Sequence, residues 1–228
     1  MGSAAAAIPG ANVVRKIVPL DRENRLDVAA ICAAIDSDTR VVVICNPNNP
    51  TGTKITLSEI EQIISKTPSE ALVFVDEAYI EFTDDPASET AIEFAKSRSN
   101  VLVSRTFSKI HGLAGLRVGY GIANAGVISR LKDYMLGGLA FNMPGILAAQ
   151  QAIDDQDHIR ATLKLNRTIH ETWTKFFHDV GWQMTPSVTC FAWVNLGTDC
   201  SPLVEFLADR NVLVGGGQRW DLPNYIRI

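Results

Sequence analysis

The sequence predicts an α/β fold with a large, mostly parallel sheet, and two observations support this. Short β-branched runs alternate with longer amphipathic stretches from Asn12 onward, as they do in chains built from successive strand, helix and strand units. Most of the short runs are almost entirely apolar, which is typical of parallel strands that helices cover on both faces. The chain has 228 residues, 46% of them apolar, so it can bury a core large enough for such a sheet.

The first part of the chain is expected to alternate strands with crossover helices. The strands are predicted at residues 13–18, 40–45, 72–76, 101–105 and 118–122. The helices are predicted at residues 27–35, 57–65 and 88–95. Thr56 and Glu59 stand at the start of the second helix with the spacing of a capping box, which satisfies free amide groups at a helix N-terminus.

A second, smaller α/β domain is expected after Tyr120, where the pattern changes to long helices. Helices are predicted at 125–136, at 144–180 with a break near Asp157, and at 202–210, and strands at 190–196, near Val212 and from Tyr225 onward. We therefore expect a large domain over residues 1–140 and a long helix with a small domain over residues 141–228. Because the last strand begins just before Ile228, the small domain is expected to be incomplete.

The composition favours small-molecule partners. The formal net charge is -4, and no block of basic residues would attract nucleic acid or an anionic membrane surface. The four cysteines have neither CxxC spacing nor nearby histidines, so neither a disulfide framework nor a metal site is expected. This cysteine usage fits a reducing cytoplasm.

Polar clusters follow three successive strands of the expected sheet. They are NPNNPTG at residues 46–52, DEAY at 76–79 and SRTFSK at 104–109, the last leading into LAGLRVG at 113–119. Ligands bind at the carboxyl ends of the strands in open α/β sheets, so one ligand could touch all three clusters. Each cluster alone has a structural alternative: a tight turn, a helix cap or ion pair at Asp76, and a solvated lysine at Lys109. Their joint occurrence in order favours a binding site.

These segments resemble the class I and II aminotransferases, which depend on pyridoxal 5'-phosphate (PLP) and have fold type I. The resemblance is greatest to the histidinol-phosphate aminotransferase branch, through the motifs at 46–52, 76–82, 106–109 and 113–119. It implies a homodimer, and it implies that this chain is a fragment lacking the N-terminal part of the large domain and the end of the small one. Cys190 stands where many members of the branch have asparagine, so the choice of amino donor stays open.

The resemblance assigns roles around the cofactor ring. Lys109 matches the lysine that forms a Schiff base with PLP and then moves a proton during transamination. Asp76 matches the carboxylate that keeps the pyridine nitrogen protonated, so that the ring can accept electrons. Asn49 and Tyr79 match the residues that hydrogen-bond the phenolic oxygen of the cofactor. Lys109, Asp76 and Tyr79 are thus the expected catalytic residues.

Further matches concern the phosphate and the substrate. Thr106, Ser108 and Arg117 match the hydroxyl and guanidinium donors that bind the cofactor phosphate. Arg227, in LPNYIRI at residues 222–228, matches the arginine that binds the α-carboxylate of the substrate, with Asn49 beside it. The structural alternatives are a surface charge for Arg117 and a strand-end arginine for Arg227.

The expected reaction is transfer of an amino group to a 2-oxo acid such as 2-oxoglutarate. The donor would be an L-amino acid or an amino-phosphate, either aromatic or similar to histidinol phosphate. Two alternatives remain open at this point: a PLP-dependent decarboxylase or lyase of the same fold, and a non-catalytic remnant of it. The first would keep the same cofactor residues and differ only in which bond at Cα it breaks.

Overall fold

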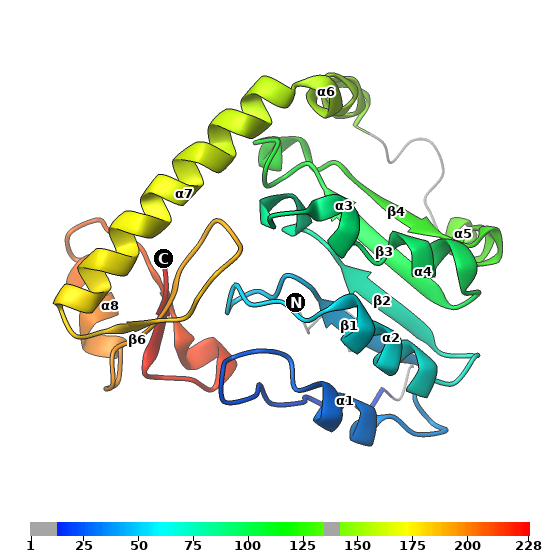
Figure 1. Cartoon of the computed structure of the whole chain (residues 1–228), viewed down its shortest axis with the longest axis horizontal. Helices are drawn as coiled ribbons and strands as arrows, with labels where there is room; N and C mark the ends of the chain where they lie inside the picture. The colour runs from blue at the N-terminus through cyan, green and yellow to red at the C-terminus, as the bar shows by residue number, and fades with distance from the viewer. Residues whose placement is uncertain (1–12, 135–141) are drawn as a thin grey trace.

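A computed structural model of the chain describes residues 13–134 and 142–228 (Figure 1). Its helices are α1 (Val28–Ala34), α2 (Leu57–Lys66), α3 (Pro86–Glu89), α4 (Ile92–Ser97), α5 (Ala125–Lys132), α6 (Met143–Asp154), α7 (Gln156–Asp179) and α8 (Ser201–Ala208), with short 3-10 turns η2 (Ile80–Phe82), η3 (Ala114–Leu116) and η5 (Gly217–Trp220). Its strands are β1 (Val41–Cys45), β2 (Leu72–Asp76), β3 (Val101–Thr106), β4 (Gly119–Ala123), β5 (Gln183–Met184), β6 (Trp193–Asn195), β7 (Gly215–Gly216) and β8 (Tyr225–Arg227). None of the described helices is both long and apolar enough to cross a membrane.

The first sheet confirms the predicted α/β architecture. Its strand order is β1-β2-β3-β4, in which the first three strands run parallel and β4 pairs antiparallel with β3. The predicted strand at 72–76 matches β2 to the residue, and β1, β3 and β4 match within one residue at each end. Because β1, β2 and β3 are parallel, their carboxyl ends meet at one edge of the sheet.

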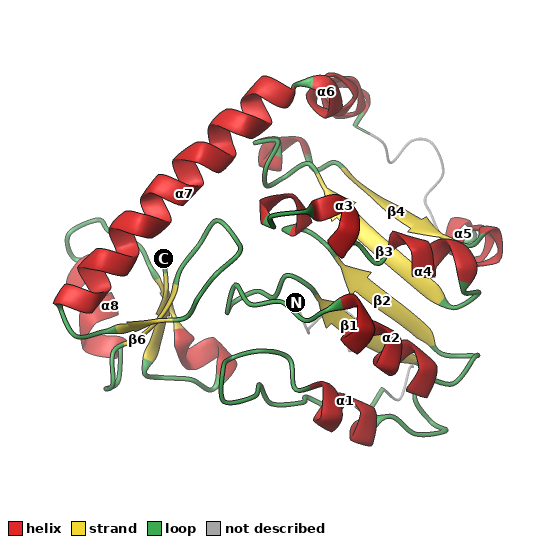
Figure 2. Ribbon diagram, viewed as in Figure 1, coloured by secondary structure: helices red, strands yellow, loops and turns green. Residues whose placement is uncertain are grey.

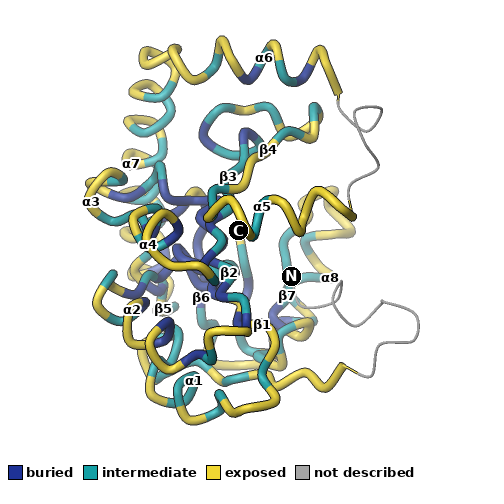
Figure 3. Tube along the Cα trace, turned by 90° about the vertical axis from the view of Figure 1, so that its right-hand side faces the viewer, coloured by how far each residue is buried: buried dark blue, intermediate teal, exposed yellow. Residues whose placement is uncertain are grey.

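The core of this sheet lies on one face. The alternate side chains Val42, Ile44, Val73, Val75, Val101 and Val103 pack with Ile60, Ile63 and Ile64 of α2 and with Ala95 of α4. Every one of these side chains is buried, as the period of two in a strand requires when one face meets helices. Figure 3 shows the buried stretches gathered in the middle of the molecule, with exposed trace along α5 and α6.

The opposite face of the sheet carries Asp76 at its carboxyl end. Val41 and Val43 on this face are 54% and 59% exposed. The register aligns Cys45 of β1 with Asp76 of β2 and with Ser104 of β3, so these three side chains form a row across the strand ends. Burial raises the pKa of the Cys45 thiol to about 11, and the neighbouring Asp76 carboxylate adds to this rise.

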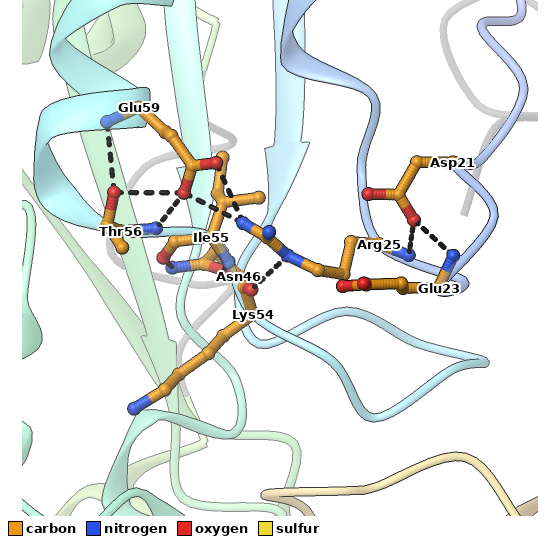
Figure 4. Close-up of polar contacts among 8 residues, drawn as sticks. All are labelled: Asp21, Glu23, Arg25, Asn46, Lys54, Ile55, Thr56 and Glu59. Atoms are coloured by element: carbon orange, nitrogen blue, oxygen red, sulfur yellow. Dashed lines mark hydrogen bonds and ion pairs between the residues drawn. The ribbon is translucent and has the colours of Figure 1, made fainter.

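Helix α2 begins with the predicted capping box. The Thr56 hydroxyl accepts a hydrogen bond from the Glu59 amide at 3.2 Å, and the Glu59 carboxylate accepts one from the Thr56 amide at 2.7 Å. The same carboxylate receives the Arg25 guanidinium at 2.7 and 2.9 Å, while the Arg25 Nε donates to the Lys54 carbonyl at 3.3 Å (Figure 4). Arg25 thus joins the turn before α1 to the loop that leads into α2.

The second part of the chain is a small antiparallel sheet packed against a long helix. Its strand order is β5-β6-β8-β7. Helix α7 runs from the region of α6 to this sheet (Figure 2), where Phe177 packs with Ala192, Val194 and Ile226. The predicted break in the long helix lies at Asp155, whose carboxylate caps α7 by accepting from the His158 amide at 3.0 Å. The expected domain boundary between residues 140 and 141 lies outside the described residues.

The predicted strand at 13–18 is wrong. These residues form no sheet ladder, and Val14 and Ile17 are 82% and 81% exposed. A strand needs a neighbour that accepts its backbone hydrogen bonds, and none of the described strands pairs with this segment. Lys16 instead reaches the Ala34 carbonyl at the end of α1 and the carboxylate of Asp36.

Other boundaries also differ from the sequence prediction. The expected helix at 88–95 is divided into α3 and α4, because the Glu77 carboxylate accepts from the Thr90 hydroxyl and from the Ala91 amide between them. The expected strand at 190–196 forms only at β6, and residues 190–192 before it belong to no strand. The strand expected near Val212 lies instead at β7, where two glycines pair with β8.

Glu77 is expected to stabilise the large domain strongly. Its side chain is almost fully buried and binds the Arg105 Nε at 3.0 Å, the Thr90 hydroxyl at 2.8 Å and the Ala91 amide at 2.6 Å. Replacing Glu77 with leucine leaves the partly buried Arg105 charge and the Ala91 amide without this partner. We expect the free energy of unfolding to fall by about 3–5 kcal/mol, measured by denaturant titration.

The matched control is Glu93→Ala. Glu93 also pairs with a cation, Lys96 at 2.7 Å, but both side chains are exposed on α4. That substitution is expected to change the free energy of unfolding by less than about 1 kcal/mol. Equal effects of the two substitutions would contradict the structural role given to Glu77.

Candidate active site

The loop at residues 46–52 uses most of its polar side chains to hold its own shape. The Asn46 amide donates to the Ile55 carbonyl at 3.2 Å and accepts from the Ile55 amide at 2.8 Å, which closes the base of the loop. Asn48 donates to the Thr51 hydroxyl at 2.8 Å. Among the described residues, the buried Oδ1 of Asn49 has no hydrogen-bond partner. Asn49 is therefore the member of this motif that is available for a ligand.

Gly52 lets the small domain approach this loop closely. Its φ is +74°, a left-handed conformation that glycine adopts readily. The Val188 amide donates to the Gly52 carbonyl at 2.9 Å, and a Cβ at Gly52 would lie 2.1 Å from the Ser187 Oγ. Glycine at this position thus allows a segment more than a hundred residues later to dock beside Asn49.

Asp76 presents a buried carboxylate with one oxygen already held. Its Oδ1 accepts from the Ala78 amide at 3.1 Å and from the Ser104 hydroxyl at 3.2 Å. Burial raises the pKa of Asp76 above its usual value, although these two donors and the positive charge of Lys109 oppose the rise. A cationic N–H placed at the other oxygen would stabilise the ionised form.

A chain of ring contacts connects Lys109 with Arg227. The Lys109 Nζ lies 5.2 Å from the centroid of the Tyr79 ring, and the Tyr79 ring meets the Phe191 ring edge-on at 5.2 Å. The Arg227 Cζ lies 4.1 Å from the centroid of Phe191. The structure therefore brings Asp76, Tyr79, Lys109 and Arg227 into one region, although they come from the end of β2, two loops and β8.

The third cluster forms a set of donors beside Lys109. The Ser108 amide donates to the Thr106 hydroxyl at 3.1 Å, and the Arg117 Nη1 lies 3.4 Å from the Ser108 Oγ and 2.9 Å from the Ala114 carbonyl. Arg117 is exposed and has a φ of 53°, which is uncommon for a residue with a side chain. Such left-handed residues are found where the surrounding structure demands a particular direction of the side chain.

Two residues that were not assigned from the sequence join this region. Ser104 donates to Asp76, and its alignment with Asp76 across β2 and β3 follows only from the strand register. Phe191 lies between Tyr79 and Arg227, and the aromatic residue itself carried no signal of this role in the sequence. Cys190, the residue before it, lies within electrostatic reach of both Lys109 and Arg227.

A cleft on the described surface lies elsewhere. It has a volume of about 450 Å³ and is lined by the turn at Asn24, by Thr53 and Lys54, and by Met184 and Thr185 of the second domain. None of the residues assigned from the motifs lines it. In the described parts of the chain, no group of three or more His, Cys, Asp or Glu side chains could hold a metal ion.

The chain was compared with protein-family models and with curated proteins of known sequence. Residues 3–228 match the family model described as Aminotransferase class I and II. The chain is 38% identical over 223 residues to a histidinol-phosphate aminotransferase of Brevibacillus brevis, covering 97% of this chain and 60% of that protein. It is 37% identical over 226 residues to one of Maricaulis maris, with coverages of 96% and 60%. The chain thus spans about 60% of the length of these curated relatives.

Solved structures that resemble this chain are also named as histidinol-phosphate aminotransferases. A putative histidinol-phosphate aminotransferase from Erwinia carotovora atroseptica superposes with a TM-score of 0.85 and 32% identity, covering 94% of this chain and 62% of that one. A histidinol-phosphate aminotransferase from Sinorhizobium meliloti, solved in complex with pyridoxal-5'-phosphate, superposes with a TM-score of 0.84 and 27% identity, covering 93% and 58%.

Proposed function

Because the chain belongs to the class I and II aminotransferase family, we propose that it carries out PLP-dependent amino transfer. The donor is an L-amino acid or an amino-phosphate, either aromatic or similar to histidinol phosphate. The acceptor is a 2-oxo acid such as 2-oxoglutarate. The observation that carries this proposal is the placement of the Lys109 amine against Tyr79, close enough to Asp76 for its charge to act on that buried carboxylate.

The residues around Asp76 fit the ring of PLP. The bound cofactor supplies an aldehyde and a ring that accepts electrons from the substrate. Lys109 would hold the cofactor as a Schiff base, and its amine would serve as the base that moves a proton at the substrate Cα. The second oxygen of Asp76 would accept a hydrogen bond from the protonated ring nitrogen, since Ala78 and Ser104 already occupy the first oxygen. Asn49, with an unpartnered buried amide oxygen, and Tyr79 bind the phenolic oxygen, the amide turning its N–H₂ toward it.

The donors beside Lys109 fit the cofactor phosphate. Thr106 and Ser108 offer hydroxyl groups, and Arg117 offers a guanidinium with its side chain already directed toward Ser108. A phosphate dianion gains most from several short hydrogen bonds and one cation. We assign the three residues to that group, which anchors the cofactor while Lys109 is released.

Arg227 is assigned to the substrate carboxylate, with Asn49 beside the same ligand. Its Nε is buried and has no hydrogen-bond partner among the described residues. A guanidinium binds a carboxylate through two parallel N–H donors, and both the amino donor and the 2-oxo acid present that group. One arginine therefore serves both halves of the reaction.

The oligomeric state, the location in the cell, the partners and the domain division are also proposed. Arg117 is exposed beside the phosphate site, which fits completion of the site by a second copy in a homodimer. The free cysteines Cys32, Cys45, Cys190 and Cys200 fit a cytoplasmic location. The net charge of -4 favours small-molecule partners over nucleic acid or membranes. We divide the chain into a large PLP-binding domain over 1–140 and a long helix with the small domain over 141–228.

A single-turnover experiment tests the reaction. The full-length protein loaded with PLP is incubated with L-glutamate or histidinol phosphate and no acceptor. Amino transfer predicts one equivalent of the donor's oxo product per bound PLP, with further turnover only after a 2-oxo acid is added. Release of carbon dioxide instead would assign a decarboxylase, and no product from any donor in an amino-acid panel would contradict the proposal.

A further inference from the structure

Phe191 belongs to the second domain but is buried against the first. It is 3% exposed and forms a cluster with Ala78 and Tyr79 at the end of β2. It also meets the Arg227 guanidinium, whose Cζ lies 4.1 Å from the ring centroid. Its ring therefore separates the side chain that contacts Lys109 from the cation assigned to the substrate carboxylate.

The contact with Phe191 leaves the donors of Arg227 free. A guanidinium that lies over an aromatic ring contacts the ring through the flat face of the guanidinium group. The N–H groups of the guanidinium point outward in its own plane. The unpartnered and buried Nε of Arg227 agrees with this arrangement. An arginine held in this way loses little side-chain freedom when a carboxylate binds, because the ring has already restricted it.

The backbone around Phe191 is clamped from several sides. The Ser187 hydroxyl donates to the Phe191 carbonyl at 2.9 Å, and the Val188 amide donates to the Gly52 carbonyl at 2.9 Å. The Asn166 amide of α7 donates to the Thr189 carbonyl at 3.1 Å. The segment thus has a set position relative to the loop that carries Asn49, and Phe191 has little room to move.

We propose that Phe191 is a positioning residue for the substrate carboxylate, and that it acts by orienting the guanidinium of Arg227. This inference rests on the proposed function, in which Arg227 binds that carboxylate. Phe191 touches no reacting atom, so it affects the binding of substrate and acceptor more than the chemical step. The Tyr79 ring, which meets the Phe191 ring edge-on at 5.2 Å, restricts the movement of Phe191.

Kinetics of the full-length, PLP-loaded protein test the proposal. Phe191→Leu removes the aromatic face, and we expect the KM for 2-oxoglutarate to rise about tenfold while kcat changes less than about threefold. Phe191→Tyr keeps the face and is expected to restore the KM. The matched control is Phe206→Leu, since Phe206 lies 3.6 Å from the Arg210 Cζ on the exposed side of α8. If Phe191→Leu does not fold, Phe191→Met is used in its place.

A second readout does not depend on turnover. Phenylglyoxal modifies arginine side chains, and peptide mass spectrometry measures the rate at Arg227 with and without 2-oxoglutarate. The wild-type protein is expected to show protection that Phe191→Leu loses and Phe206→Leu keeps. An unchanged KM and unchanged protection in Phe191→Leu would overturn the positioning role alone. A wild-type protein that shows neither protection nor amino transfer would overturn both this inference and the proposed function.

Discussion

Lys109→Ala is expected to abolish amino transfer. The substitution removes both the amine that holds the cofactor and the base that moves the substrate proton, so kcat should fall by at least about 10⁴-fold. The fold should remain intact, because Lys109 is half-buried at a loop, where its Nζ lies over the ring of Tyr79. Steady-state kinetics and borohydride reduction of the PLP-loaded protein measure the two losses.

The control for this substitution is Lys96→Ala. Lys96 is an exposed lysine that pairs with Glu93 on α4 and lies outside the site, so its removal should leave both activity and labelling unchanged. Borohydride should attach the cofactor to the peptide that contains Lys109 in the wild-type protein and in Lys96→Ala. A reducible linkage that persists in Lys109→Ala would refute the assignment of the Schiff base.

Asp76→Asn is expected to lower kcat by about 10²–10⁴-fold, the range found when a group that controls a proton is removed. The amide cannot balance a positive charge on the ring nitrogen, so the ring accepts electrons poorly. PLP should still bind, because Lys109 and the donors at Thr106, Ser108 and Arg117 remain. Kinetics and a PLP titration separate these effects. A variant with near wild-type kcat would remove Asp76 from the mechanism.

Asp76→Asn should also change how the free energy of unfolding depends on pH. Burial raises the pKa of Asp76 in the folded state, so the native protein binds this proton more tightly than the unfolded chain does. The free energy of unfolding of the PLP-free protein should therefore decrease as the pH rises from the usual aspartate value near 3.8 through the raised pKa. Asp76→Asn should lose this decrease and be at least as stable as wild type at neutral pH.

Asp85→Asn provides a comparison for that pH effect. Hydrogen bonds from Ser88 lower the pKa of Asp85, so the stability it contributes is present above its usual pKa and is lost as the pH falls. Its pH dependence thus has the opposite sign to that of Asp76. Asp85 caps α3, away from the ring contacts of Lys109, and its substitution should leave amino transfer unchanged. Denaturant titrations between pH 3 and pH 8 measure both trends.

Local patterns in the sequence determined much of the fold. The apolar run at 72–76 has the pattern of a strand in a parallel sheet, and it forms β2. Thr56 and Glu59 cap α2 through hydrogen bonds that span only three residues. Asp76 and Lys109 were assigned from motifs at strand ends, and parallel strands place such ends together. These features depend on residues near one another in the chain or on a rule that every parallel sheet obeys.

Long-range contacts decided the rest. Residues 13–18 have the composition of a strand, but they form one only if a neighbour accepts their hydrogen bonds. The helix expected at 88–95 is interrupted because Glu77, distant in sequence, binds the Thr90 hydroxyl and the Ala91 amide. Neither outcome can be derived from the segment's own residues.

The candidate site also combines features that follow from the sequence with features that only the tertiary structure decides. The sequence by itself supplied the proposal of which side chains carry the chemistry, since the identities and spacing of Asp76, Lys109 and Arg117 are visible in the motifs. Only the tertiary structure decided that Phe191 lies between Tyr79 and Arg227, and that Gly52 admits the segment which holds it there. The physical reason is that packing joins residues by distance in space, whereas a motif records only their order along the chain.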